Sequence, residues 1–201
     1  VSGEQRDKLT HAGIYGVDVS MATLENVYGI DLTYYARVNF TSLITIVDAL
    51  GGVDVNSEYD FEAGGYQFHK GTNTLNGEQA LAFSRERYSF QAGDNQRGKN
   101  QEAVLTGILQ KAMSPAVLTN ANQIIASVSD SVETNMTQQD MAKFINMQLS
   151  DGASWTIESV AATGTGDTQA CYSSGSQPLY VMWPDGAVVS SIKEKMNQVI
   201  K

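Results

Sequence analysis

The chain of 201 residues is 42% hydrophobic and 17% charged, which is typical of a globular protein with one sizeable core, so we expect a single domain over residues 1–201. Its 13 lysines and arginines against 22 aspartates and glutamates give a net charge of −9, which argues against nucleic acid as a partner. The single cysteine, Cys171, excludes an internal disulfide, and no apolar run reaches the roughly 18 to 20 residues of a membrane-spanning helix.

Helical and extended patterns alternate along the first part of the chain. Helices are predicted over 7–13 and 20–30, the second with Ser20 as its N-cap. Aromatic and β-branched residues predict a strand over 32–40.

A short apolar helix is predicted next, over 43–50, with Thr41 or Ser42 as its cap and the following glycine pair as its end. Another extended segment begins at 53–55. This order of strand, helix and strand indicates α/β layering.

The middle of the chain has clear turn and cap signals. Residues 56–74 are irregular and contain a predicted hairpin that turns at Gly64-Gly65. Asn76 is expected to cap a helix over 77–83, and a second helix is predicted over 95–113.

The remaining segments complete the α/β pattern without an internal repeat or a linker. Thr137 is the expected N-cap of one of these helices. In chain order we predict helices over 122–132 and 137–149, a strand over 154–161, a Gly/Ser/Thr-rich loop over 163–176, a strand over 179–183 and a helix over 185–201.

A basic cluster stands out in the stretch "RERYSFQAGDNQRGKNQ", which holds three of the five arginines of this acidic chain. If the backbone is extended there, Arg85 and Arg87 point the same way. Arg97 and Gln101 share one face near the start of the next helix, which Asp94 is positioned to cap. Two guanidinium groups side by side repel each other unless an anion lies between them, so the spacing predicts a phosphate or pyrophosphate site.

The alternative is a solvated loop in which Arg87 pairs with Glu86 or Asp94. Other chemistries lack support, because the sequence has no G-x-S-x-G elbow and no phosphate-binding P-loop. The two histidines, His11 and His69, have no neighbouring ligands at zinc spacing, so we interpret His11 as a packed neutral imidazole.

Four segments together carry a resemblance to a known family: "DKLTHAGIYG", "YYARVNFTSLITIVDALGGVDV", "LNGEQALAFSRERYS" and "GDNQRGKNQ". In this order they resemble the LytR-CpsA-Psr family of Gram-positive cell-wall enzymes, and closely its streptococcal capsule-assembly members. The resemblance implies a three-layer α/β/α sandwich with a central mixed sheet that binds a polyprenyl-pyrophosphate lipid. It also implies transfer of a lipid-linked glycopolymer, capsular polysaccharide or teichoic acid, onto peptidoglycan.

The family pattern assigns roles to particular residues of this chain. Arg85 and Arg87 match its paired pyrophosphate-binding arginines, and Asp94, Arg97 and Gln101 match the D-x-x-R-x-x-x-Q pattern that follows. The resemblance thus implies that Arg97 is catalytic and that Asp94 is the catalytic base or orients Arg97.

Two further residues fall on the family pattern. Lys8 lies in a K-L-x-x-A segment and is implied to line the pyrophosphate site. Asp48 also matches, but we interpret its carboxylate as a cap for local backbone before the glycine turn. Apolar faces around Val104 and Ile124 are candidates for a lipid tunnel or for plain core.

The chain also departs from the family pattern, which has strands upstream of "DKLTHAG" with aspartates that help to bind Mg²⁺ and a further arginine. We therefore expect a domain truncated at its N-terminus, which lacks those strands, has no metal ligand of its own and partners a separate N-terminal segment. The family setting is the outer face of the cytoplasmic membrane of a Gram-positive bacterium, with an N-terminal membrane anchor outside this chain. A pyrophosphate-binding or pyrophosphatase module without transfer activity and a transcriptional attenuator are the alternative functions.

Overall fold

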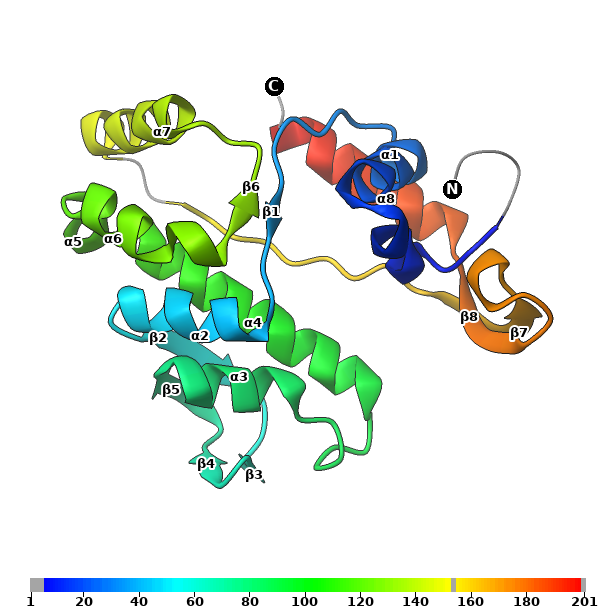
Figure 1. The fold of residues 1–201 in the computed structure, drawn as a ribbon. Coiled ribbons are helices and arrows are strands. Elements are labelled where there is room, and N and C mark those ends of the chain that lie inside the picture. The colour runs from blue at the N-terminus through cyan, green and yellow to red at the C-terminus, as the bar shows by residue number, and fades with distance from the viewer. Residues whose placement is uncertain (1–5, 153–154, 200–201) are drawn as a thin grey trace. The chain divides into compact units, whose positions relative to one another are not determined.

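The computed structural model describes residues 6–152 and 155–199 (Figure 1). The chain divides into two compact units. We call Val1–Tyr35 together with Ser159–Lys201 the terminal unit, and Ala36–Glu158 the middle unit.

The middle unit combines helices with short antiparallel strands. Its elements are β1 (Ala36–Arg37), α2 (Phe40–Ala49), β2 (Val53–Ser57), β3 (Phe61–Ala63), β4 (Tyr66–Phe68), β5 (Gly71–Leu75), α3 (Gly77–Arg85), α4 (Asp94–Ala112), α5 (Pro115–Leu118), α6 (Ala121–Val128), η2 (Ser129–Ser131), β6 (Glu133–Thr134) and α7 (Gln138–Asp151). β2 pairs with β5, β3 with β4, and β1 with β6, all antiparallel.

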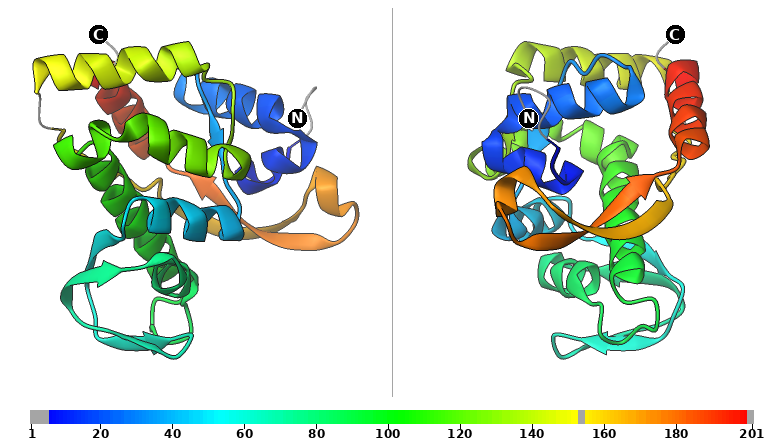
Figure 2. Two further views of the ribbon diagram at one scale, coloured as in Figure 1. Left: turned by 60° about the vertical axis from the view of Figure 1, so that its left-hand side comes forward. Right: turned by 90° about the vertical axis from the view of Figure 1, so that its right-hand side faces the viewer.

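The terminal unit joins the two ends of the chain. It contains η1 (Leu9–Tyr15), α1 (Val17–Tyr28), β7 (Gly164–Ala170), η3 (Tyr172–Ser174), β8 (Pro178–Pro184) and α8 (Gly186–Val199). β7 and β8 form a long antiparallel ribbon, and β8 leads directly into α8 (Figure 2). The backbone N–H of Tyr172 donates to the carbonyl of Arg6, which ties the start of the unit to its C-terminal half.

The core of the middle unit lies between β2, α2, α3 and α4. Side chains of β2 alternate, so Val53, Val55 and Ser57 are buried while the two residues between them are exposed. α4 packs against β2 and α3, as Figure 1 shows. The approach is so close that a Cβ on Gly107 would lie 2.5 Å from the carbonyl oxygen of Asp54, which explains a glycine within this helix.

The start of α3 is held by local and long-range hydrogen bonds. Asn76 Oδ1 accepts from the backbone N–H of Gln79, and Gln79 Oε1 accepts from that of Asn76, a complete capping box. Asp48 Oδ1 accepts from the N–H of Gly77 at 2.8 Å. The expected cap of local backbone by Asp48 was therefore wrong in its partner, because the carboxylate stabilises the neighbouring helix instead.

The α/β class and several local predictions are confirmed. The hairpin at Gly64-Gly65, the cap at Asn76 and the cap at Thr137 are all present. The strands of the described residues pair as four separate two-stranded antiparallel sheets, so these residues do not form the expected central mixed sheet.

Other boundaries differ from the prediction. Of the strand predicted over 32–40 only Ala36–Arg37 pairs, and Asn39, not Thr41 or Ser42, caps α2 through a bond from the Ser42 N–H. Ser20 lies inside α1, where its hydroxyl donates to the carbonyl of Gly16.

The largest error concerns the segment before β8. Residues 155–161 form no strand, and residues 153–154 lie outside the described residues. β7 occupies Gly164–Ala170, where a loop was predicted, because pairing with β8 rather than local propensity makes this segment extended.

Candidate anion-binding site

Arg85 and Arg87 lie at the point where α3 ends. Arg85 is the last helical residue, and Glu86 after it is extended. The Arg85 guanidinium carbon lies 4.8 Å from the centre of the Phe40 ring, and that of Arg87 lies 4.8 Å from the centre of the Tyr88 ring. Arg87 Nη2 also donates to the Tyr88 hydroxyl at 3.1 Å. Both guanidinium groups therefore rest on aromatic rings at the surface.

Neither of these two arginines forms an ion pair with any residue that the structure describes. Other cations of the middle unit do have carboxylate partners: Arg37 pairs with Glu133 at 3.3 Å, and Lys99 pairs with Glu58 at 3.0 Å. Among the described residues, two exposed guanidinium groups within three positions thus lack an internal counterion in a chain of net charge −9.

Glu86, which lies between the two arginines, does not neutralise them. Partial burial raises the pKa of its carboxyl group, but hydrogen bonds from Ser89 and from the backbone of Tyr88 and Arg87 lower the pKa further, to a net value below the usual 4.5. Its Oε1 accepts from the Ser89 N–H at 2.7 Å. The charge of Glu86 therefore shapes the loop, and the alternative of an Arg87–Glu86 pair was wrong.

Arg97 and Asp94 are directly joined. Both lie in the first turn of α4, where Arg97 Nη2 and Asp94 Oδ1 form an ion pair. The N-cap of this helix is Gly93, at φ 50°, so the prediction of Asp94 as a cap was wrong. Gln101 follows one turn after Arg97 and is exposed. The carboxylate that was expected to cap the helix instead holds an arginine of the proposed site.

Two buried amides position α4 against α3, and the sequence did not reveal them. Gln96 Nε2 donates to Asn100 Oδ1 at 3.2 Å, and Asn100 Nδ2 donates to the carbonyl oxygen of Phe83 at 3.2 Å. Phe83 is two residues before Arg85, so this chain of bonds connects the helix that carries Arg97 to the end of the helix that carries Arg85. The sequence pattern from which they could have been identified is the spacing of Gln96, Asn100 and Val104, which places these residues on one face of the helix.

That face differs from the apolar face read from the sequence. Val104 is buried, but Leu105 is 56% exposed and Leu109 is 43% exposed. The buried stripe of α4 is thus partly polar, and two leucines on the same helix remain at the surface.

Lys8 lies in the terminal unit, next to a buried carboxylate. The side chain of Asp7 is 2% exposed and accepts hydrogen bonds from the Lys8 N–H at 2.7 Å and the Ser173 N–H at 2.9 Å. His11 Nδ1 lies 3.0 Å from Asp7 Oδ1 and 2.7 Å from the Ser173 hydroxyl. The imidazole is therefore hydrogen-bonded, not simply packed, and the backbone of Lys8 is fixed.

Metal ligands do not gather within the part of the chain that the structure describes. No group of three or more histidine, cysteine, aspartate or glutamate side chains there is arranged to hold a metal ion. Asp94, the one carboxylate of the basic stretch that faces an arginine, is already paired with Arg97. Among the described residues, no helix is both long and apolar enough to span a membrane.

Comparison with known proteins gives a consistent result. The model of the LytR_cpsA_psr family matches residues 1–196. A relative from Bacillus cereus, named polyisoprenyl-teichoic acid–peptidoglycan teichoic acid transferase TagU, is 41% identical over 136 residues, which cover 67% of this chain and 45% of the relative. The chain thus matches less than half the length of this curated relative.

Solved structures share the fold. The crystal structure of B. subtilis TagU superimposes with a TM-score of 0.75 at 29% identity, and covers 100% of this chain and 80% of that one. A structure described as TagT bound to LI-WTA has a TM-score of 0.73 at 25% identity, and covers 98% of this chain and 72% of that one.

Proposed function

The chain belongs to the LytR-CpsA-Psr family, and we propose that its middle unit binds the pyrophosphate of a polyprenyl-linked glycopolymer for transfer to peptidoglycan. The observation that carries this proposal is the pair Arg85 and Arg87, which are exposed and have no carboxylate partner among the described residues. Guanidinium groups match phosphate oxygens in bidentate geometry. The transferase name of the B. cereus relative supports the same reaction class.

The surroundings of Arg85 favour a lipid diphosphate over a free one. Its guanidinium lies over Phe40, whose side chain is 59% exposed. Leu105 and Leu109 add further exposed apolar surface in the same unit. A cation beside an apolar ring suits a ligand whose charged headgroup continues into a hydrocarbon chain, since each part then meets a surface of its own kind.

The proposed reaction is a phosphoryl transfer. A hydroxyl oxygen of the peptidoglycan glycan attacks the phosphorus that bears the glycopolymer, and the bond from this phosphorus to the bridging oxygen breaks. Polyprenyl phosphate leaves with the electron pair, and the hydroxyl proton passes to a carboxylate or to water. Arg85, Arg87 and Arg97 stabilise the charge that develops on the leaving phosphate, where preorganised cations have their largest effect.

This scheme allows two alternative roles for Asp94. Its ion pair with Arg97 favours an orienting role, because the carboxylate already holds the guanidinium group in place. The alternative is that Asp94 takes the proton of the attacking hydroxyl. We propose the orienting role, with Gln101 as an additional donor to the phosphate oxygens.

The proposal also covers the location of the protein in the cell, the glycopolymer that it transfers and the metal ion that it requires. We propose that the protein acts in the cell envelope, on the outer face of a membrane to which an anchor outside this chain attaches it, and that its glycopolymer is teichoic acid or capsular polysaccharide. Among the described residues, no group of three or more histidine, cysteine, aspartate or glutamate side chains is arranged to hold a metal ion. We propose a Mg²⁺ requirement separately, and loss of transfer in EDTA that returns with MgCl₂ is its test.

The first experiment measures binding of polyprenyl pyrophosphate to Arg85→Ala and Arg87→Ala, with Arg37→Ala as the matched control because Arg37 already pairs with Glu133. Each site variant should lose about tenfold in affinity, which corresponds to one charge-assisted hydrogen bond, and the control should bind normally. Equal binding by all three would contradict the proposal. Normal binding without transfer of a labelled glycopolymer to peptidoglycan would favour the non-catalytic module instead.

A further inference from the structure

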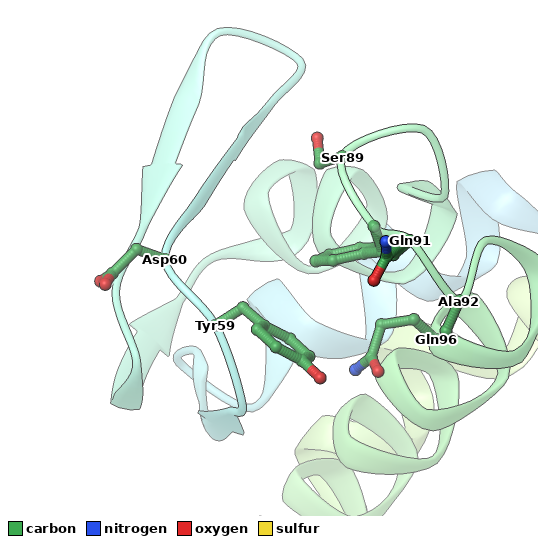
Figure 3. A pocket seen from close by; sticks show the side chains of 7 residues that line it. Tyr59, Asp60, Ser89, Gln91, Ala92 and Gln96 are labelled. Atoms are coloured by element: carbon green, nitrogen blue, oxygen red, sulfur yellow. The ribbon is translucent and has the colours of Figure 1, made fainter.

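A pocket of about 600 Å³ lies in the middle unit (Figure 3), and neither Arg85 nor Arg87 is among its lining residues. It falls within the roughly 300–1,000 Å³ of small-molecule sites. Its lining comes from two loops and the first turn of α4, namely Tyr59, Asp60, Ser89, Phe90, Gln91, Ala92 and Gln96.

The walls of this pocket are held in place from several directions. The Ser57 hydroxyl donates to the carbonyl of Tyr59 at 2.7 Å, and Phe90 packs edge-on against Phe61 with ring centres 4.9 Å apart. The ion pair of Lys99 with Glu58 connects α4 to the loop that carries Tyr59, and the hydrogen bond that Lys99 donates to Glu58 raises the pKa of Lys99. These contacts hold the lining residues against their neighbours and define the shape of the pocket.

Its chemistry combines aromatic faces with neutral polar groups. The Tyr59 and Phe90 ring centres are 5.7 Å apart and their planes are inclined by 45°. Tyr59 and Gln96 converge from opposite walls, whereas the Asp60 carboxylate points away from both (Figure 3). Gln96 is 3% exposed, and its Oε1 accepts no hydrogen bond from the residues described. Among the described residues, no lysine or arginine lines the pocket, so an anionic group is disfavoured.

We propose that this pocket binds an uncharged sugar ring of a glycan, an inference that rests on the proposed transfer of a glycopolymer to peptidoglycan. A pyranose presents C–H faces, which pack on aromatic rings, and hydroxyl groups, which donate to carboxamide oxygens such as Gln96 Oε1. Tyrosine serves both needs, with an apolar face and a polar tip.

The chain itself connects this pocket to the arginines. Lining residues 89–92 lie between Arg87 and Arg97, and Gln96 directly precedes Arg97. The shared segment favours a sugar attached to the bound pyrophosphate, while a sugar of the acceptor glycan has the same chemistry. The experiment separates these two sources.

Three probes are compared: polyprenyl pyrophosphate without sugar, the same lipid with a disaccharide, and peptide-free glycan strands of peptidoglycan. Tyr59→Ala removes a ring that is 49% exposed, so folding should survive, and Tyr180→Ala removes a tyrosine that is 65% exposed and lies outside the pocket lining. Tyr59→Ala should weaken binding of one sugar-bearing probe about three- to tenfold, in line with the loss of roughly one hydrogen bond and its packing. Its binding of the sugar-free lipid should equal that of Tyr180→Ala.

Weaker binding of the disaccharide lipid identifies the donor sugar, and weaker binding of the glycan strands identifies the acceptor. Gln96→Met, with a thermal midpoint measured alongside, should weaken binding of the same sugar-bearing probe. Unchanged binding of both sugar probes, or equal losses for all three probes, would overturn the inference. Failure of the proposed function would be a separate result: binding of the sugar-free lipid would not depend on Arg87. The glycan strands carry no pyrophosphate, so they test the pocket alone.

Discussion

Two polar regions of the molecule handle charge in opposite ways. In the terminal unit, the carboxylate of Asp7 is buried and accepts hydrogen bonds from Lys8, Ser173 and His11. In the middle unit, Arg85 and Arg87 are exposed and have no carboxylate partner within the described ranges 6–152 and 155–199. A charge that is satisfied internally contributes to folding, whereas a charge left without a partner is available to a ligand.

The prediction with the largest expected effect tests whether buried core residues, and not the exposed arginines, stabilise the middle unit. Phe83 is fully buried, and its ring lies 5.2 Å from that of Phe61 and 5.3 Å from that of Phe68. Phe83→Ala should lower the free energy of unfolding by about 3–5 kcal/mol, the usual loss for a buried phenylalanine. Urea denaturation measures it.

Arg87→Ala is the contrasting variant in the same experiment. It removes an exposed cation without a carboxylate partner among the described residues, so its unfolding free energy should stay within about 0.5 kcal/mol of the wild type. If Arg87→Ala lost nearly as much unfolding free energy as Phe83→Ala, the arginine would have a structural role. The contrast between the two polar regions would then be wrong.

The second prediction concerns the buried carboxylate. Asp7→Ala leaves the N–H groups of Lys8 and Ser173 and the Ser173 hydroxyl without their acceptor. We expect a loss of about 2 kcal/mol in stability, typical of hydrogen bonds to a charged group. Asp31→Ala, at an exposed position of the same unit, is the control. Hydrogen exchange at the Ser173 amide should accelerate only in Asp7→Ala, and unchanged protection there would contradict the assignment.

Acid should weaken the same network. Burial raises the pKa of Asp7, but hydrogen bonds from Ser173, Lys8 and His11 lower it further, so its net value in the folded protein is below the usual 3.8. The ionised form is thus favoured by folding, and its contribution is complete above the unfolded-state pKa and lost as pH falls through the lowered one. The hydroxyl of Tyr15 also interacts with this group. Its pKa is raised, mainly by burial and next by the charge of Asp7.

Thermal unfolding between pH 6 and pH 2.5 measures this loss. The midpoint of the wild type should fall more steeply below pH 4 than that of Asp7→Asn, because the amide cannot be protonated in this range. Other carboxyl groups with lowered pKa values, such as Asp140 and Asp167, are common to both proteins and cancel in the difference. Parallel curves would show that Asp7 does not contribute in its ionised form.

The sequence predicted those features whose causes are local. The caps at Asn76 and Thr137 and the turn at Gly64-Gly65 depend on residues within a few positions of each other. β7 was missed because its residues are extended only by pairing with β8, which lies beyond a separate turn. The strand predicted over 32–40 failed for the opposite reason, since strand propensity there finds a partner for only two residues.

The same division applies to the candidate site. The spacing of Arg85, Arg87 and Arg97 is visible in the sequence, and their shared pocket stays a prediction. Gln96 and Asn100 could not be assigned, because their roles depend on the backbone carbonyl of Phe83, which is reached only through the packing of α4 against α3. The lack of a carboxylate partner for Arg85 and Arg87 among the described residues is likewise a property of the folded chain, so the sequence alone did not predict it.

The smallest expected effect sharpens the comparison at Asp94, where one arginine of the site does have a partner. The side chains of Arg97 and Asp94 are 37% and 69% exposed, so Asp94→Asn should change stability by no more than about 1 kcal/mol, as for other surface pairs. The variant frees the Arg97 guanidinium from a competing anion, and affinity for polyprenyl pyrophosphate should therefore rise about twofold or stay unchanged.

If Asp94 only orients Arg97, glycopolymer transfer should fall moderately and recover in Asp94→Glu. If transfer is abolished in both variants while binding is retained, Asp94 is the base that accepts the hydroxyl proton. Weaker binding in Asp94→Asn would contradict the expectation that the carboxylate competes with the ligand, because it would mean that Arg97 needs the Asp94 carboxylate to reach the ligand. Unchanged binding together with unchanged transfer would contradict both roles.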